Sequence, residues 1–278
     1  MSMTWDGAPP PDPPRLSLRD RLRAARRAAP LLLLLATGFP LLLLLRPAER
    51  MVWGAERPVT PWITQGVCRA ACRLFGLTLR VEGRPMRGMG AYVANHVSWL
   101  DIFVLNASKR LYFVAKDEVA GWGGIGWLAR GTGTVFIRRD RADAARQARL
   151  LAERLEAGHR LLFFPEGTST DGLRVLPFRT TLFAAFFAPG LRETLQIQPV
   201  SIVYAAPDGE PASFYGWWGG AGFGSSLLAV LAVRRQGSVR VVYHAPLRVA
   251  DFGDRKALAA AAEAAVRAGF ESGVERRP

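Results

Sequence analysis

Histidine, cysteine and lysine are scarce in this chain of 278 residues, and each scarcity narrows what the protein can be. It has two cysteines, Cys68 and Cys72, which are too few for a disulfide framework or a four-cysteine zinc site. Only three of its 37 basic residues are lysine, so the formal net charge of +14 comes almost wholly from arginine. Together with the abundant alanine, this skew indicates a compositional bias and not one designed patch.

Nucleic-acid signals are also lacking. A charge of +14 suits nucleic acid, an anionic membrane or a phosphorylated substrate. The sequence has no zinc-finger spacing, no RNA-binding aromatic motif and no helix-turn-helix signal. We therefore expect no nucleic-acid partner, and we look for an anionic membrane surface or an anionic substrate.

The N-terminal part divides at about residue 28. Residues 1–27 begin with "MSMTWDGAPPPDPP" and continue with six arginines, which predicts a basic, partly disordered arm. Residues 28–57 contain "PLLLLLATGFPLLLLL", close to the lower limit for a spanning helix, and form the predicted membrane segment and linker. Pro40 removes a helical hydrogen bond and predicts a kink or hairpin there. A spanning helix, a re-entrant hairpin and an interfacial helix are all possible.

Residues 58–278 have the pattern of one α/β domain. Thr60 and Pro61 predict a helix start, and strand patterns such as "LTLRVEG" and "GAYVANH" alternate with helical ones. This order predicts a mixed, mostly central β-sheet of about seven strands flanked by helices. A second apolar region, residues 214–233, is either an interfacial segment or a buried loop and helix.

The stretch "NHVSWLD" holds one of the three histidines, at the end of a predicted strand. Ser98 and Asp101 fit a helix cap, with Asp101 in the place where a capping box has Glu. This interpretation does not explain His96. One helical turn also brings Asp101 beneath His96, where a carboxylate can orient the imidazole as a general base. Spacing alone leaves both interpretations open.

Two further stretches place polar groups after predicted strands. "GTVFIRRD" ends a strand in Arg138 and Arg139, and guanidinium groups suit phosphate oxygens. "FFPEGTSTDG" places Glu166 in a tight loop, where it can bind a substrate hydroxyl or order the loop. Each is ambiguous alone, because arginine is common in this chain and Pro-Glu-Gly is ordinary turn chemistry.

In this order, "NHVSWLD", "GTVFIRR", "FPEGTS" and "IQPV" resemble the four motifs of the glycerolipid acyltransferase family, over residues 77–247. The resemblance implies a catalytic dyad of His96 and Asp101, without a metal or cofactor. It also implies that Arg139 contacts the acceptor's phosphate, with Arg138 in a variable position. The remaining substrate-binding residues that it implies are Glu166, Gly167, Thr168 and Ser169 in the acceptor loop, Arg179 after it, and Pro199 on the acyl side.

One departure concerns the acceptor. Many members have arginine where Ser169 stands, and Arg174 or Arg179 can substitute for it. The resemblance implies acylation of the sn-2 hydroxyl of lysophosphatidate to give phosphatidate. The variant loop, with Asp171 and Gly172, also resembles members that acylate lyso-ornithine lipid, an acceptor without phosphate. A non-enzymatic, basic membrane-surface protein is the alternative from another class, but it leaves the ordered motifs to chance.

The expected chemistry also constrains location. An acyl thioester of coenzyme A or acyl carrier protein is the implied donor, and both carriers are cytosolic. We therefore expect the enzyme on the cytoplasmic face of a bacterial inner membrane. A single span with the arginine-rich N-terminus inside would put the domain outside, so a re-entrant or interfacial segment fits better.

Overall fold

The computed structural model describes residues 5, 7, 9–138, 144–188 and 190–275, and it confirms the predicted α/β class. An eight-stranded sheet runs in the order β1-β7-β6-β2-β5-β3-β4, with β8 paired to β6. Most neighbours are parallel, and β7 and β8 are antiparallel to β6. The strands are β1 (Thr78–Glu82), β2 (Gly90–Ala94), β3 (Tyr112–Lys116), β4 (Val135–Ile137), β5 (Leu161–Phe163), β6 (Gln196–Ala205), β7 (Ser238–Tyr243) and β8 (Leu247–Arg248).

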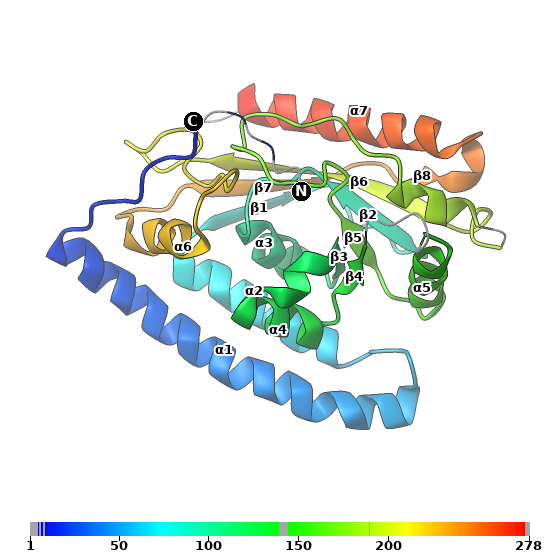
Figure 1. Cartoon of the computed structure of the whole chain (residues 1–278), viewed down its shortest axis with the longest axis horizontal. Helices are drawn as coiled ribbons and strands as arrows, with labels where there is room; N and C mark the ends of the chain where they lie inside the picture. Colours follow the sequence, from blue (N-terminus) through cyan, green and yellow to red (C-terminus); the bar gives the residue numbers. More distant parts are fainter. Residues whose placement is uncertain (1–4, 6, 8, 139–143, 189, 276–278) are drawn as a thin grey trace.

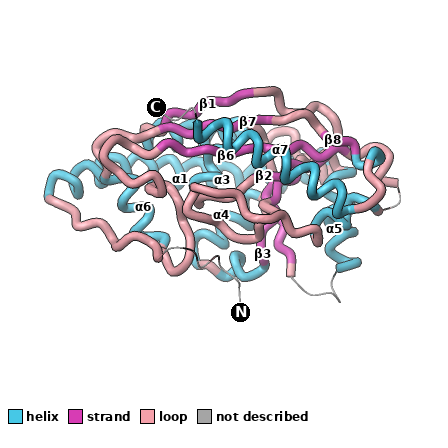
Figure 2. Tube along the Cα trace, turned by 90° about the horizontal axis from the view of Figure 1, so that it is seen from above, coloured by secondary structure: helices cyan, strands magenta, loops and turns pink. Residues whose placement is uncertain are grey.

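Helices cover both faces of this sheet. Helix α7 lies along one face, and α1, α2, α3, α4 and α6 lie on the other (Figures 1 and 2). The helices are α1 (Leu18–Trp53), α2 (Thr60–Phe75), α3 (Leu100–Ser108), α4 (Gly123–Thr132), α5 (Ala144–Glu156), α6 (Phe223–Ala232) and α7 (Arg255–Glu275). Short 3-10 helices are η1 (Asp117–Gly121), η2 (Leu182–Phe187) and η3 (Val249–Asp251).

Strand β2 is the centre of the sheet and positions the site. All five of its residues are buried, and it pairs in parallel with both β5 and β6. Its side chains alternate between two cores: Tyr92 and Ala94 pack toward α2 and α3, and Ala91 and Val93 pack toward α7. Because β2, β5, β3 and β4 are parallel, the loops after them emerge at one edge of the sheet, where α/β proteins place their sites.

Helix α1 is continuous through Pro40, so the hairpin that was one of the two predictions for this position is wrong. The helix begins inside the predicted arm, where Ser17 and Asp20 form a capping box. It then passes through three prolines without ending. Packing on both sides of Pro40 explains this continuity. Gly38 lets α1 approach Val67 of α2 so closely that a Cβ would lie 2.5 Å from its methyl group, and Phe39 packs edge-on against Trp127 of α4 at 4.3 Å. Tertiary contacts thus outweigh the lost helical hydrogen bond.

Helix α1 lies alongside the domain, with one side packed and one side exposed (Figure 1). By length and composition it is the one helix among the described residues that is long and apolar enough to cross a bilayer. Only 17% of the most apolar stretch of 18 residues in this helix is buried. Leucines such as Leu32, Leu33 and Leu44 are more than half exposed, so an apolar surface runs along the outer side of the helix.

The apolar region 214–233 packs mainly within the protein. Trp218 is buried, and α6 lies against α1. Arg27 of α1 donates to the carbonyls of Leu231 and Val233 at the end of α6, at 3.0 and 2.7 Å. These contacts support the second of the two interpretations of this region, a buried loop and helix.

Candidate active site

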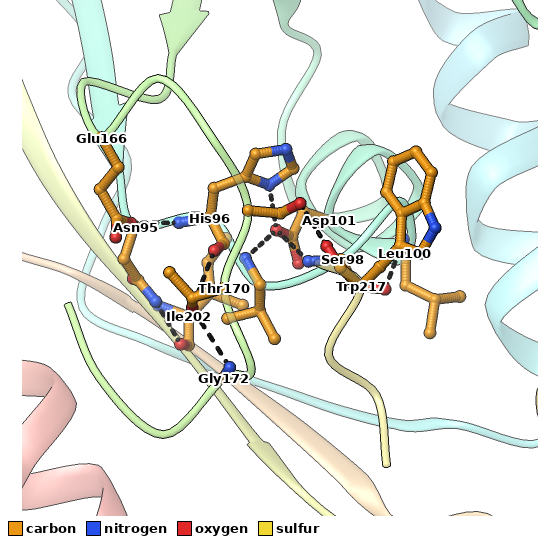
Figure 3. Close-up of polar contacts among 12 residues, drawn as sticks. Asn95, His96, Ser98, Leu100, Asp101, Glu166, Thr170, Gly172, Ile202 and Trp217 are labelled. Atoms are coloured by element: carbon orange, nitrogen blue, oxygen red, sulfur yellow. Dashed lines mark hydrogen bonds and ion pairs between the residues drawn. The ribbon is translucent and has the colours of Figure 1, made fainter. Parts of the chain in front are cut away.

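His96 and Asp101 lie in contact at the carboxyl end of β2. The Nδ1 atom of His96 is 2.8 Å from Oδ2 of Asp101 (Figure 3). The His96 side chain is 19% exposed, whereas Asp101 is fully buried. With Nδ1 engaged by the carboxylate, the other ring nitrogen, Nε2, is left for a substrate. The local geometry is thus that of a base with an orienting carboxylate.

Asp101 is held by more than the histidine. Its Oδ2 atom also accepts the backbone N–H groups of Val97 and Ser98 at 2.8 and 3.0 Å. Its Oδ1 atom accepts the hydroxyl of Tyr204, on β6, at 2.8 Å. Tyr204 is fully buried, and burial followed by the neighbouring Asp101 raises its pKa well above the usual value, so the phenol remains a donor. The sequence analysis missed Tyr204, which is 103 positions from Asp101.

The two interpretations of Asp101 are compatible in geometry, because the same carboxylate contacts both His96 and the N–H of Ser98, although the N-cap of α3 is Trp99 and not Ser98. Asp101 reaches back to the N–H of Ser98, as the third residue of a capping box does. The hydroxyl of Ser98 accepts from the N–H of Leu100 at 3.3 Å. Since Asp101 already accepts the N–H groups of Val97 and Ser98, these two amides are not available to stabilise an oxyanion.

The His96 ring and backbone are fixed by the loop that follows β5. The imidazole stacks on Phe164 with ring centroids 3.9 Å apart and an angle of 8°. The backbone N–H of His96 donates to Oε1 of Glu166 at 2.6 Å, and its carbonyl accepts the N–H of Thr170 at 3.1 Å (Figure 3). Asn95, which precedes His96 in the chain, makes two bonds to the sequence-distant Ile202 of β6, at 2.8 and 2.9 Å. His96 is thus attached to three strands.

Glu166 is 2% exposed and joins two segments of the site. Its second oxygen, Oε2, accepts the N–H of Leu176 at 2.7 Å. Burial raises its pKa to about 8, although the N–H groups of Leu176 and His96 act in the opposite direction. These two backbone contacts fit the loop-ordering role, one of the two roles predicted for Glu166. The other role, contact with the acceptor, stays a prediction.

The predicted acceptor loop lies beside His96 and closes on neighbouring segments. Gly167 has a φ of 73°, which a turn of this kind requires and L side chains rarely adopt. The hydroxyl of Ser169 donates to the backbone carbonyl of Trp217. The backbone N–H of Trp217 donates in turn to the carbonyl of Val97 at 2.9 Å. Thr168 accepts the N–H of Trp5 at 3.3 Å, so the N-terminal arm reaches this loop.

The other predicted substrate residues lie farther from the dyad. Arg138 ends β4, three strands from β2 and about 14 Å across the sheet, and donates to Asp117 at 3.0 Å. Arg179 is exposed after the loop. Pro199 is buried in β6, level with Val93. Arg139 lies outside the described residues.

Comparisons with known proteins show which family and fold the chain shares. Residues 79–203 match the family described as Acyltransferase. The chain is 58% identical over 268 residues to a lyso-ornithine lipid O-acyltransferase of Rhodobacter capsulatus, covering 96% of each chain. It is 37% identical over 247 residues to a protein of the same name from Pseudomonas aeruginosa, covering 89% of this chain and 93% of that one. The crystal structure of the 1-acyl-sn-glycerophosphate (LPA) acyltransferase from Thermotoga maritima superposes with a TM-score of 0.58 at 22% identity, over 91% of this chain and 99% of that one.

Proposed function

This chain belongs to the glycerolipid acyltransferase family and acts on lysolipids, and from that premise we propose that it is a lyso-ornithine lipid O-acyltransferase. The acyl donor is a thioester of coenzyme A or acyl carrier protein. The relative from Rhodobacter capsulatus supports the acceptor, because its similarity extends over nearly the whole of both chains.

The loop after β5 carries the choice of acceptor. Residues 164–173 contain no arginine or lysine, and Ser169, at a position where many family members have arginine, is bonded to the Trp217 carbonyl. The nearest basic residue along the chain, Arg174, is paired with the buried Asp171 at 2.8 Å. A phosphate-bearing acceptor would need uncompensated positive charge here. An ornithine headgroup carries an ammonium and a carboxylate together, and it suits a loop of balanced charge.

In the proposed mechanism, Nε2 of His96 takes the proton of the acceptor hydroxyl as the oxygen attacks the thioester carbonyl. Asp101 keeps the other ring nitrogen protonated and stabilises the imidazolium that forms. The tetrahedral intermediate then expels the thiolate, which receives the proton from His96. General-base assistance of this kind contributes roughly 10²–10⁴-fold to the rate.

Lysophosphatidate is the second candidate acceptor, and Arg138 favours it. Arg138 directly follows β4, whose end lies at the same edge of the sheet as His96, and its side chain is 66% exposed. It is paired with Asp117 at 3.0 Å, so it would exchange Asp117 for the phosphate of a lipid whose hydroxyl lies at His96.

We further propose that α1 rests in the cytoplasmic leaflet of a bacterial inner membrane. Its exposed leucines and its packing along the domain support an interfacial helix more than one that leaves the domain to cross the bilayer. This arrangement keeps His96 on the side of the cytosolic donors.

The deciding experiment follows thiol release by the purified full-length protein with lyso-ornithine lipid and lysophosphatidate side by side. We expect kcat/KM to favour lyso-ornithine lipid by about tenfold or more, which corresponds to ~1.4 kcal/mol. Ser169→Arg should shift the ratio toward lysophosphatidate, whereas Ser225→Arg, which adds the same charge on α6, should leave it unchanged. A wild-type preference for lysophosphatidate would establish the second candidate.

A further inference from the structure

Three arginines gather at the end of the sheet opposite to His96. Arg46 of α1, Arg57 of the linker and Arg154 of α5 surround Tyr112, the first residue of β3, and we call them the arginine cluster. The guanidinium carbons of Arg57 and Arg154 lie 5.5 and 4.8 Å from the Tyr112 ring centroid. Tyr112 pairs with Leu161 of β5, which in turn pairs with Ala91 of β2. Ala91 precedes His96 by five residues, so the arginine cluster and His96 are about 16 Å apart along the strand direction.

The arginine cluster has little neutralising charge. Among the described residues, Glu49 is the acidic residue that pairs with any of the three, 3.9 Å from Arg46. Its carboxylate oxygens are already engaged by the backbone of Val59 and by Thr60. The cluster therefore carries an excess of positive charge.

Two donors of the arginine cluster, and the hydroxyl of Tyr112 beside it, are also unsatisfied. Nε of Arg46, Nη1 of Arg57 and the hydroxyl of Tyr112 are buried without a hydrogen-bond partner. Tyr112 is 7% exposed, and such atoms normally have partners. Burial, and then the charges of Arg57 and Arg46, lower the pKa of Arg154 to about 10. Three guanidinium groups that repel one another and are partly buried would be stabilised by a bound anion.

We propose that the arginine cluster binds a phosphate group, supplied by an anionic phospholipid of the bilayer on which α1 rests. Guanidinium groups bind phosphate oxygens in pairs, and one phosphate can bridge two of the three arginines. The last turn of α1 supports the lipid source, because Met51, Val52 and Trp53 are exposed beside the cluster, and tryptophan favours the headgroup level. This inference rests on the proposed membrane placement and not on the acyl-transfer chemistry.

The first test measures the melting temperature of the full-length protein in detergent with inorganic phosphate, against chloride at equal ionic strength. Phosphate should raise the melting temperature of the wild type by about 2–4 °C. Arg57→Gln should respond by less than about 1 °C and, since repulsion is relieved, should melt no lower than the wild type without phosphate. Arg50→Gln removes an equal charge from an exposed position of α1 and should respond as the wild type does.

The second test separates the two sources of phosphate by flotation with phosphatidylglycerol or phosphatidylcholine vesicles. Arg57→Gln should weaken binding to phosphatidylglycerol by about threefold more than Arg50→Gln, without such a difference on phosphatidylcholine. If phosphate stabilises the protein but the two variants float equally, the lipid source is refuted. If phosphate does not distinguish Arg57→Gln from the wild type, the cluster is only a contact between α1 and the domain, and the proposal is refuted. If Arg57→Gln fails to fold, both tests are repeated with Arg46→Gln.

Discussion

Tyr204→Phe removes one oxygen atom from the proposed catalytic site and leaves the buried ring in place. The lost hydroxyl donates to Oδ1 of Asp101 at 2.8 Å. Asp101 then keeps its three bonds through Oδ2, but Oδ1 is buried without this donor.

The structure sets the size of the effect. A lost hydrogen bond to a charged group costs about 1.5–3 kcal/mol, and the ring leaves no cavity, so we expect the free energy of unfolding to fall by about 2 kcal/mol. An Asp101 carboxylate that is held less firmly orients the His96 imidazole less well, so kcat should fall by about tenfold while KM changes little.

Steady-state thiol release, which gives kcat and KM, and urea unfolding check both effects. Tyr243→Phe is the matched control, because Tyr243 is a buried tyrosine that bonds to Ser108 at 2.6 Å, away from the dyad. It should cost stability without lowering kcat. Wild-type kcat in folded Tyr204→Phe would refute the idea that Tyr204 orients Asp101.

Three further outcomes are expected. His96→Ala should lower turnover by roughly 10²-fold or more in folded protein, measured by thiol release. Burial raises the pKa of Glu166 from 4.5 to about 8, so between these pH values the folded state holds a proton that the unfolded chain has lost. Urea unfolding should therefore show the free energy of unfolding falling as the pH rises from 4.5 to about 8, and it should fall less steeply in Glu166→Gln. Cysteines introduced before Leu18 and in α7 should both be shielded from an impermeant label in intact cells, whereas labelling of the α7 site alone would show that α1 spans the membrane.

The proposed dyad could be predicted from the sequence because it is local. His96 and Asp101 are five positions apart, and one strand end followed by one helical turn is enough to bring them together. The fold class was equally accessible, since strand and helix periodicities alternate along the chain. Cys68 and Cys72 are free, buried thiols.

The support of the dyad could not be predicted, because it depends on which strands become neighbours. Tyr204 reaches Asp101, and Asn95 reaches Ile202, only because β6 lies beside β2. The sequence left two roles open for Glu166, binding of a substrate hydroxyl and ordering of the loop, and the burial of Glu166 between the backbone amides of His96 and Leu176 depends on contacts between distant segments. The hairpin predicted at Pro40 is wrong for a similar reason: local propensity allows it, whereas the tertiary contacts of Gly38 and Phe39 keep α1 one helix.

The central position of β2 also has a consequence for the order in which a newly made chain becomes active. Helix α1 and the His96–Asp101 segment leave the ribosome early, but the partners that fix them come later: Glu166 follows His96 by 70 positions, and Tyr204 follows Asp101 by 103. Pairings of such sequence separation form slowly. If the proposed attachment through α1 comes first, His96 stays unoriented until β6 has been made and inserted beside β2. Chains that end before Tyr204 should reach the bilayer without gaining the activity.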